Sequence, residues 1–230
     1  YKIEFEEMWG SNTNTPDPLN AKFGANKIDN TPHNFTVDGI AIELYFSPSD
    51  NTESHIVSTL QTANNDINFA MLTYTSNPIG DVMVNRQNSG VTCRGVIHNT
   101  SYFGSEYNSL LSAGVDVVST QTNLTVTHHK YAIIDAGDLN SDPTVITGSH
   151  NWSNSAEDDY DENLLIIHDQ FIAHQYLEEF LSRRPLSSEV NENSINNTTI
   201  SYPNPVTSKL TIENKDNILA YQIIDNSGRV

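Results

Sequence analysis

The sequence of 230 residues has little cysteine, few basic side chains and no long apolar run. Its single cysteine, Cys93, excludes an internal disulfide framework and a zinc site built from cysteines. Because no run approaches the roughly eighteen apolar residues that a membrane-spanning helix needs, no such helix is predicted. Eleven lysines and arginines stand against 29 aspartates and glutamates, which gives a formal net charge of −18 at pH 7.

The shortage of basic residues is greatest in the middle of the chain. Between residues 37 and 185 there are 19 acidic side chains and five basic ones. Surfaces that bind nucleic acid normally carry clustered lysine and arginine. No such cluster occurs in this stretch, which argues against tight, nonspecific binding of duplex nucleic acid by this chain alone.

Apolar patterns from residue 40 onward predict alternating strands and helices. Strand-like runs cover residues 40–46, 67–74, 91–97, 128–135, 144–147 and 164–167. Helical patterns follow the first three runs and the last one, beginning near residues 50, 76, 107 and 169. Asp50 with Glu53 predicts a capping box for the first of these helices. The order predicts an α/β fold, a layered α/β/α domain whose sheet is mixed.

The first nine residues have the apolar spacing of a helix, and residues 10–36 have the composition of a loop. The opening Tyr-Lys-Ile-Glu-Phe nearly repeats the Tyr-Leu-Glu-Glu-Phe of residues 176–180. Amphipathic helices can match by chance over so few positions. The interpretation that we favour is that residues 1–36 hold the last helix of a preceding, similar unit, followed by a loop.

The composition changes after Pro185, so residues 37–185 are predicted to form the main domain. Residues 186–200 are predicted to be a polar linker, and residues 201–230 a short β-rich tail. The tail resembles the start of the C-terminal sorting domain of type IX secretion in the Bacteroidetes, through Tyr202–Pro205 and Lys209–Ile212. This resemblance implies a partial sorting domain and a secreted or cell-surface protein.

His128 and Lys130 form a His-x-Lys pattern at the start of a predicted strand. Alternate residues of a strand face the same side, so these two side chains are predicted to share a face while His129 points away. A lysine ammonium can hold the nonbridging oxygens of a phosphate while a neutral imidazole attacks phosphorus. Taken alone, the pair is a weak signal.

The residues that follow strengthen this interpretation. Asp135 ends the same apolar run, and Ser149 and Asn151 alternate after Gly148, so both are predicted to lie on one side. Serine and asparagine supply neutral hydrogen-bond donors for phosphate oxygens. We expect Gly148 to let the backbone approach a ligand closely. We expect Glu162, at the start of the next strand, to hold a histidine in one tautomer.

Together these residues resemble the His-x-Lys-x4-Asp and Gly-Ser-x-Asn motifs of the phospholipase D superfamily, and the resemblance spans about residues 37–182. It implies a phosphodiesterase that needs no metal and no cofactor, because lysine and asparagine stabilise the charge on the phosphate. The stretch between Asp135 and Gly148 is longer than the family's usual spacing, and we interpret it as an extended hairpin tip.

The resemblance also implies a role for each residue. His128 would be the nucleophile that forms a phosphohistidine, or else the general acid. Lys130 and Asn151 would bind phosphate oxygens with Ser149 nearby, and Glu162 would orient a catalytic histidine. Asp135 is counted with the catalytic set, although in the family it is more structural than catalytic.

The implied mechanism needs two histidines on opposite sides of the phosphorus. Only one His-x-Lys occurs here, and His129, His150 and His168 are expected to be surface or loop histidines. The second motif is therefore expected from an upstream repeat outside this chain or from a second copy of the chain in a homodimer. His98, at the end of a predicted strand, is a weaker candidate for lining the pocket.

Two acidic stretches invite a calcium-binding interpretation, residues 157–162 and the Asp138-x-Asn140-x-Asp142 pattern. The first lacks the spacing of a binding loop, and the second lacks the glycine and the distal glutamate of an EF-hand. Both are interpreted as solvated acidic loops, so no metal site is predicted.

Three functions remain open at this point. The leading hypothesis is a phosphodiester hydrolase that acts on a phospholipid, and the second is a nuclease of the same superfamily. The third is an inactive binding module. Scarce basic residues argue against the nuclease in this part of the chain, and the intact motif argues against the inactive module.

Overall fold

The computed structural model describes residues 1–184 except 124 and 139, together with residues 200–202 and 211–213. The chain forms two compact units, residues 1–180 and residues 181–230. The strands of the first unit are β1 (Asn34–Val37), β2 (Ile40–Phe46), β3 (Asp66–Met71), β4 (Thr92–Ile97), β5 (Asp116–Ser119), β6 (Lys130–Ile134), β7 (Thr144–Gly148) and β8 (Asn163–His168). The helices are α1 (Lys2–Trp9), the 3₁₀ turn η1 (Gly24–Asn26), α2 (Thr52–Gln61), α3 (Asn77–Asn88), α4 (Tyr107–Ser112), α5 (Asn154–Asp158) and α6 (Gln170–Arg183).

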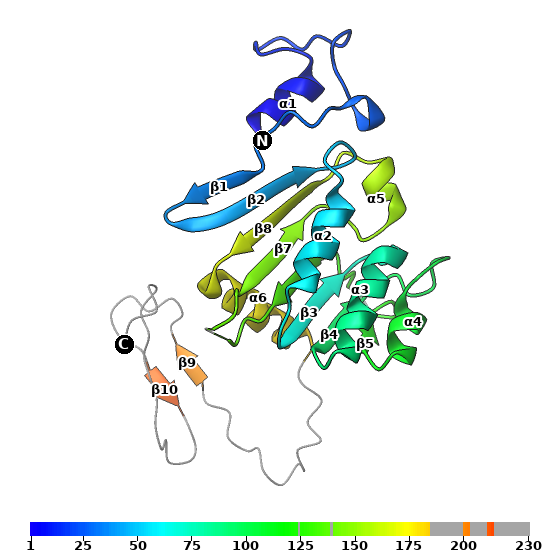
Figure 1. Ribbon diagram of the computed structural model, residues 1–230, viewed down its shortest axis with the longest axis vertical. Helices are drawn as coiled ribbons and strands as arrows, with labels where there is room; N and C mark the ends of the chain where they lie inside the picture. The colour runs from blue at the N-terminus through cyan, green and yellow to red at the C-terminus, as the bar shows by residue number, and fades with distance from the viewer. Residues whose placement is uncertain (124, 139, 185–199, 203–210, 214–230) are drawn as a thin grey trace. The chain divides into compact units, whose positions relative to one another are not determined.

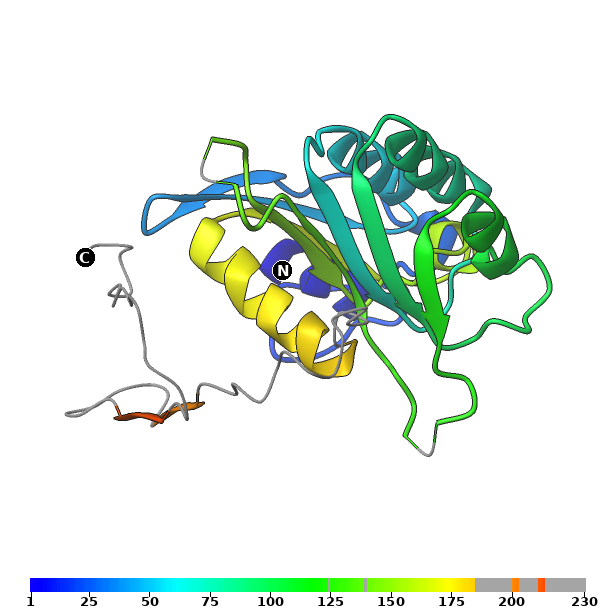
Figure 2. The same ribbon diagram turned by 90° about the horizontal axis from the view of Figure 1, so that it is seen from below.

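The eight strands make one mixed sheet in the order β1-β2-β8-β7-β6-β3-β4-β5. β3, β4 and β5 are parallel to one another, and every other pairing in the sheet is antiparallel. Helices α2, α3 and α4 cover one face and α6 covers the other (Figures 1 and 2). The predicted α/β fold with a mixed sheet between helical layers is confirmed.

An aromatic cluster joins the end of β7 to the end of β3. The rings of Tyr74 and Trp152 meet edge to face with centroids 4.8 Å apart, and Phe69 lies 5.6 Å from Trp152. All three side chains are buried. The backbone follows the same path, because the amide of Thr75 donates to the carbonyl of Trp152 over 2.7 Å. The segment after β7 is thereby fixed to the segment after β3.

Several local predictions were wrong. The expected capping box does not form, because the Asp50 carboxylate turns back to accept the amide of Phe46 at 2.8 Å and the Ser49 hydroxyl. Helix α2 therefore begins at Thr52 without a side-chain cap. Strand β6 begins at Lys130, later than expected, and β1, β5 and α5 were not predicted. By contrast, the caps of the neighbouring helices form as expected: Ser76 caps α3, and Asp169 accepts the amide of Ile172 in α6.

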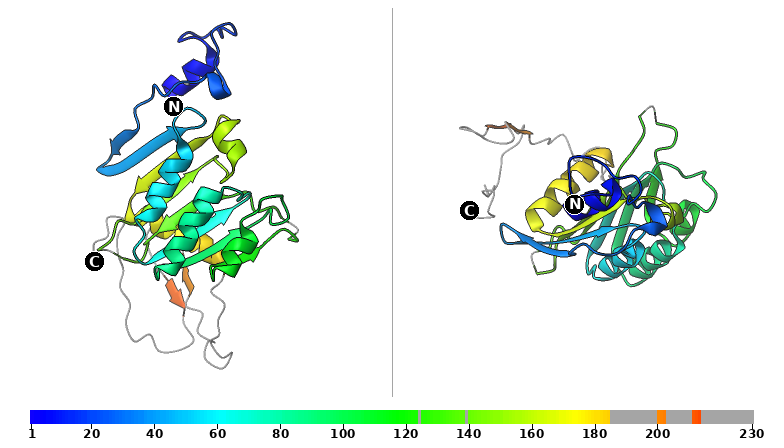
Figure 3. Two further views of the ribbon diagram at one scale, coloured as in Figure 1. Left: turned by 45° about the vertical axis from the view of Figure 1, so that its right-hand side comes forward. Right: turned by 90° about the horizontal axis from the view of Figure 1, so that it is seen from above.

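The predicted helix at the start of the chain is present as α1. The boundary expected between residues 36 and 37 falls inside β1, and residues 1–36 belong to the same compact unit as the sheet. Figure 3 shows this N-terminal segment beside the end of β2. In the second unit, β9 (Ile200–Tyr202) and β10 (Thr211–Glu213) pair antiparallel.

All of the predicted linker except Ile200 lies outside the described residues, as does most of the segment that resembles a sorting domain. Among the described helices, none is long and apolar enough to cross a membrane.

Gly95 of β4 is required by close packing, which gives a test of the core. A Cβ placed there would lie 2.1 Å from the Phe69 ring. Gly95→Ala is expected to lower the free energy of unfolding by about 1–3 kcal/mol, because the buried ring has to move. Gly137→Ala, where a Cβ meets nothing within 4 Å, is the matched control and should change it by less than about 0.5 kcal/mol. Equal effects in denaturant unfolding would contradict this description of the core.

Candidate active site

The predicted site residues come from three strand ends that lie at one edge of the sheet. Because β6 and β8 both run antiparallel to β7, the start of β6, the end of β7 and the start of β8 meet there. Tyr131 is paired with Thr147, and Gly148 with Leu164. The arrows of β2, β3 and β7 in Figure 1 all point toward this edge. Antiparallel pairing thus brings together residues 128–130, 149–151 and 162.

His128 and Lys130 lie at the entry to β6. The His128 side chain is exposed, and the Lys130 ammonium donates to the His128 carbonyl over 3.3 Å. The next carbonyl, that of His129, accepts the amide of Leu72 at 2.8 Å, which ties the motif to the end of β3. The strand itself begins at Lys130, so His128 and His129 precede it. The lysine contact and the neighbouring strand hold the histidine backbone in its place.

The charge of Lys130 is tuned by its surroundings. Burial lowers the pKa of Lys130 from its ordinary value, and the nearby Glu162 carboxylate acts in the opposite direction by favouring the ammonium. The two residues predicted to hold phosphate and to orient a histidine therefore share one electrostatic environment.

Ser149 and Asn151 follow β7 at the same edge. The Ser149 hydroxyl accepts the backbone amide of Asn163 at 3.1 Å, so it ties β7 to the start of β8. The Asn151 side-chain oxygen is buried and makes no hydrogen bond within the described part of the chain. Gly148 has φ of +153°, and a Cβ there would lie 2.1 Å from the Asn163 carbonyl oxygen. Glycine is thus required here by the close approach of strand β8.

Glu162 is half-buried in the loop that leads into β8. Its backbone is held by Ser47, whose amide donates to the Glu162 carbonyl over 3.1 Å and whose hydroxyl accepts the Glu162 amide at 3.3 Å. No hydrogen bond joins Glu162 to His128 among the described residues. Glu162 acts on Lys130 through electrostatics.

Asp135 lies apart from the other candidates. It follows the far end of β6, and five residues of strand from Lys130 span about 16 Å. Its side chain is completely buried. It accepts the backbone amides of Asn64, Asn65 and Asp66 at 2.8–2.9 Å and the Ser141 hydroxyl at 2.6 Å.

These contacts also set the charge of Asp135. Burial acts to raise the pKa of Asp135, but the hydrogen bonds from Ser141 and the three amides outweigh it, so the pKa lies below its ordinary value. Its inclusion in the catalytic set is therefore corrected: Asp135 fixes the turn before β3 and cannot reach a phosphate at Lys130.

A cavity of about 440 Å³ opens beside the His-x-Lys motif. It is lined by residues of β6, β7 and α6: His128, His129, Lys130, Tyr131, Thr147, Gly148, Gln175, Tyr176 and Glu179. A second cavity, of about 310 Å³, lies beside Glu162 and is walled by α1 and the end of β2. One cavity thus borders the start of β6, and the other borders the start of β8.

The other histidines take varied positions. His150, expected to be a surface or loop histidine, lies in the loop after β7 and is buried, with its Nε2 atom 3.3 Å from a Glu157 carboxylate oxygen. His98 is also buried at the catalytic edge, where its Nδ1 atom lies 3.2 Å from the Thr120 hydroxyl. Thr120 in turn bonds Thr127, the residue before His128. His98 is not among the residues that line the cavity beside the motif, and its side-chain hydrogen bond leads to the motif through these threonines.

One group of potential metal ligands occurs among the described residues. Side-chain atoms of Asp29, His33 and Asp50 lie within 4.8 Å of one another. Each already has protein partners: His33 bonds the Leu44 carbonyl and Asp29, both at 2.9 Å. Asp50 accepts the Phe46 amide. The group is thus accounted for by contacts within the protein.

The mixed sheet with a His-x-Lys motif at its edge defines a class of α/β phosphodiesterase-like domains. The chain belongs to the family described as "Cardiolipin synthase, PLD-like domain", which matches residues 56–184. It is similar to mitochondrial cardiolipin hydrolase of Mus musculus, with 31% identity over 135 residues, 57% of this chain and 58% of that protein. It is also similar to phospholipase D of Rickettsia prowazekii (strain Madrid E), with 29% identity over 151 residues, 65% of this chain and 70% of that protein.

Solved structures show the same fold. Nuc of Salmonella typhimurium, a phospholipase D family member, superposes with a TM-score of 0.54 at 23% identity, covering 63% of this chain and 93% of Nuc. NucT of Helicobacter pylori superposes with a TM-score of 0.53 at 19% identity, covering 62% of this chain and 96% of NucT. By contrast, the chain spans only about half to three fifths of the length of the cardiolipin hydrolases that it matches.

The buried Asp135 carboxylate is predicted to stabilise the fold in a pH-dependent way. Asp135→Asn should lower the free energy of unfolding at pH 7 by about 1–3 kcal/mol, because an amide cannot accept all four donors. Since the folded pKa of Asp135 is depressed, its contribution is complete above the unfolded pKa of about 3.9 and is lost as pH falls through the folded value. Denaturant unfolding from pH 7 to pH 3 should show this difference shrinking. The exposed Asp158→Asn is the control, and a difference that grew toward low pH would refute the assignment.

The coupling between Glu162 and Lys130 predicts a shift in the pH profile. Removing the carboxylate in Glu162→Gln leaves burial unopposed, so the pKa of Lys130 should fall further and the ammonium should deprotonate at lower pH. The alkaline limb of kcat/KM for phosphodiester cleavage is therefore expected to move to lower pH. Asp158→Asn should leave that limb in place. A limb that moved upward in Glu162→Gln would contradict the coupling.

Proposed function

We propose that this chain provides one half of the active site of a phosphodiester hydrolase that works through a phosphohistidine. The observation that carries this proposal is the meeting of an exposed imidazole, a half-buried lysine and an asparagine at one sheet edge. Lys130 and Asn151 offer hydrogen-bond donors to the nonbridging oxygens, so charge that develops on the phosphate is stabilised by the chain's own groups. Membership of the PLD-like domain family supports the same chemistry.

The proposed reaction has two steps. In the first, a ring nitrogen of His128 attacks phosphorus, a P–N bond forms, and the P–O bond to the leaving alcohol breaks. A second histidine donates the proton that the leaving alkoxide takes. In the second step that histidine takes a proton from water, which attacks phosphorus and breaks the P–N bond. If the half-site had the opposite order, His128 would be the acid in the first step and the base in the second.

The second histidine is proposed to come from outside this chain's motif. The sequence holds one His-x-Lys, and the mechanism needs a partner on the opposite side of the phosphorus. An upstream repeat of the same polypeptide is the source that we favour, since α1 resembles the last part of α6 in sequence. A homodimer is the alternative, and the oligomeric state of the active protein separates the two.

A phospholipid is the proposed substrate. The main domain is strongly acidic, which disfavours a long polyanion, and cardiolipin hydrolases and phospholipases D are among its relatives. The tail's resemblance to a type IX sorting domain supports action outside the cell or at its surface. A nuclease remains the alternative that the experiment below addresses.

The test uses the chain with His128→Ala and with His174→Ala, an exposed α6 histidine that serves as the control. Hydrolysis of cardiolipin or phosphatidylcholine vesicles should fall by roughly 10³-fold or more in the first variant only, because the attacking or donating group is lost. The parent should also trap phosphate on His128 in an acid quench.

The competing functions give different results. Cleavage of plasmid DNA in EDTA without lipid turnover would favour the nuclease. Full activity of His128→Ala on every phosphodiester would end the hydrolase proposal. The absence of any turnover by a protein that carries both His-x-Lys motifs, in every oligomeric state, would leave a binding module.

A further inference from the structure

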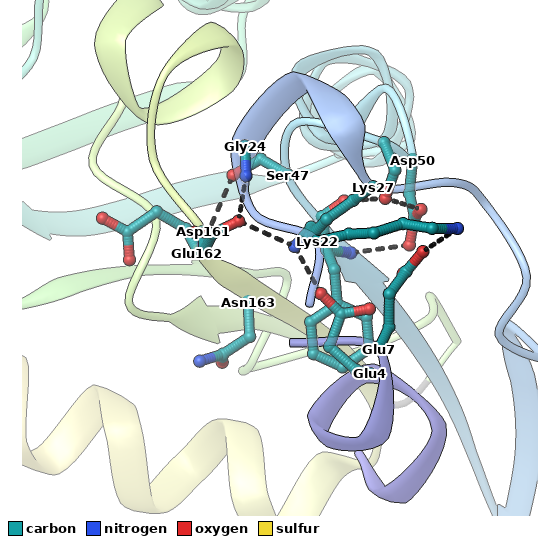
Figure 4. A network of polar contacts seen from close by, with 12 residues as sticks. Glu4, Glu7, Lys22, Gly24, Lys27, Ser47, Asp50, Asp161, Glu162 and Asn163 are labelled. Carbon is teal, nitrogen blue, oxygen red and sulfur yellow. Dashed lines mark hydrogen bonds and ion pairs between the residues drawn. The ribbon is translucent and has the colours of Figure 1, made fainter. Parts of the chain in front are cut away.

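Lys27 is a buried ammonium that the proposed chemistry does not use. It follows the 3₁₀ turn η1, and its side chain is 1% exposed. It forms an ion pair with Glu4 of α1, whose side chain is 4% exposed, and a second pair with Asp161 over 3.3 Å. A buried charge is tolerated only when it is paired and hydrogen-bonded. Lys27 therefore has a fixed position between α1 and the loop that enters β8 (Figure 4).

Asp161 is the point at which this network reaches the active site. One oxygen of its carboxylate accepts both the Gly24 amide, at 2.8 Å, and the Lys27 ammonium. The next residue is Glu162. Figure 4 shows the Glu162 carboxylate directed away from the network, so neighbouring side chains of one loop point in opposite directions. The contacts of the Asp161 side chain therefore fix the backbone from which the Glu162 side chain projects to the opposite side.

The loop that carries Glu162 lies between α5 and β8 and has few constraints of its own. The Glu162 amide bonds only the Tyr160 carbonyl and the Ser47 hydroxyl, at 3.1 and 3.3 Å. Ser47 holds the backbone from the β2 side, and its hydroxyl donates to the Tyr160 carbonyl over 2.9 Å. The contacts with Gly24 and Lys27 hold the loop from the N-terminal segment. Two separate parts of the chain thus clamp the same short loop.

We propose that Lys27 and Asp161 are positioning residues that orient Glu162 in the active site. The inference rests on the proposed role of Glu162 and adds that residues 1–36, all of which precede the family match at residues 56–184, take part in catalysis through it. The N-terminal segment is then more than a remnant of a neighbouring unit. Through the ion pair between Lys27 and Asp161, this segment sets the direction of the Glu162 carboxylate, which lies far away in the sequence.

A neighbouring ion pair provides a matched control. Lys22 pairs with Glu7 over 3.1 Å within the same N-terminal segment, and its side chain is 41% exposed. No described contact joins it to residues 160–163. Lys22→Met therefore removes a charge and an ion pair from this segment without removing a contact to the loop.

The test compares Lys27→Met, Asp161→Asn and Lys22→Met in the otherwise intact chain, with Lys27→Arg as the conservative variant. Asp161→Asn keeps an acceptor for the Gly24 amide and loses only the charge, so it decides the question alone if Lys27→Met does not fold. Lys27→Met and Asp161→Asn are each expected to lower kcat about tenfold with little change in KM, because a misplaced Glu162 carboxylate is less effective in the transition state. Lys27→Arg should recover most of this loss, and Lys22→Met should remain at the parent value.

A double-mutant cycle with Glu162→Gln separates positioning from general destabilisation. If Lys27 and Asp161 act through Glu162, adding either change to Glu162→Gln should cause no further loss. The alkaline limb of the pH profile should also move in the direction seen for Glu162→Gln. A structural role alone would give additive losses and an unmoved limb, and this result would overturn the inference while leaving the hydrolase intact.

The two levels of the proposal fail differently. If Glu162→Gln itself leaves kcat and the pH profile unchanged, the proposed role of Glu162 fails, and the positioning of Glu162 fails with it. If Glu162→Gln is impaired but Asp161→Asn behaves like Lys22→Met, only the positioning inference is wrong.

Discussion

Antiparallel pairing of β6, β7 and β8 is the constraint on which the rest of the structure depends. The candidate residues of the site lie up to 34 positions apart, from His128 to Glu162. They meet because the start of β6, the end of β7 and the start of β8 lie at the same edge of the sheet. Gly148 allows β8 to approach closely, and the Ser149 hydroxyl joins the two strands at the edge. The chemistry is therefore a consequence of register, and a slip of one residue would turn these side chains away.

The active-site edge depends on two kinds of electrostatic support. At the near end, the Glu162 carboxylate favours the ammonium form of Lys130 and so opposes the effect of burial on the pKa of Lys130. At the far end of β6, the Asp135 carboxylate accepts hydrogen bonds from four donors and holds a turn, so it takes no part in the proposed catalysis. Two acidic residues of one motif thus have different roles. Glu162 lies close to the groups proposed to react, whereas Asp135 holds a turn. A chain as acidic as this one depends on such local pairing.

Much of this arrangement could be predicted from the sequence. The strands at residues 40–46 and 91–97 could be predicted because largely apolar runs of strand length are bounded by turn residues, and the order of the strands brings His128, Lys130 and Asn151 to one end of the sheet. The predictions failed where a tertiary contact overrides a local rule. Asp50 accepts the amide of Phe46 at the end of β2 and does not cap its own helix. The link from Lys27 to Asp161 spans 134 positions and leaves no local pattern.

The position of Asp135 changes how the motif itself is to be understood. Two of its most distinctive residues, Asp135 and Gly148, serve the fold: one closes a turn and the other makes room for a neighbouring strand. Selection for a stable domain would retain both even in a copy that had lost its nucleophile. The motif therefore combines residues that stabilise the fold with residues that are proposed to carry out the reaction. Whether such a copy could still perform the proposed reaction depends on His128, Lys130 and Asn151.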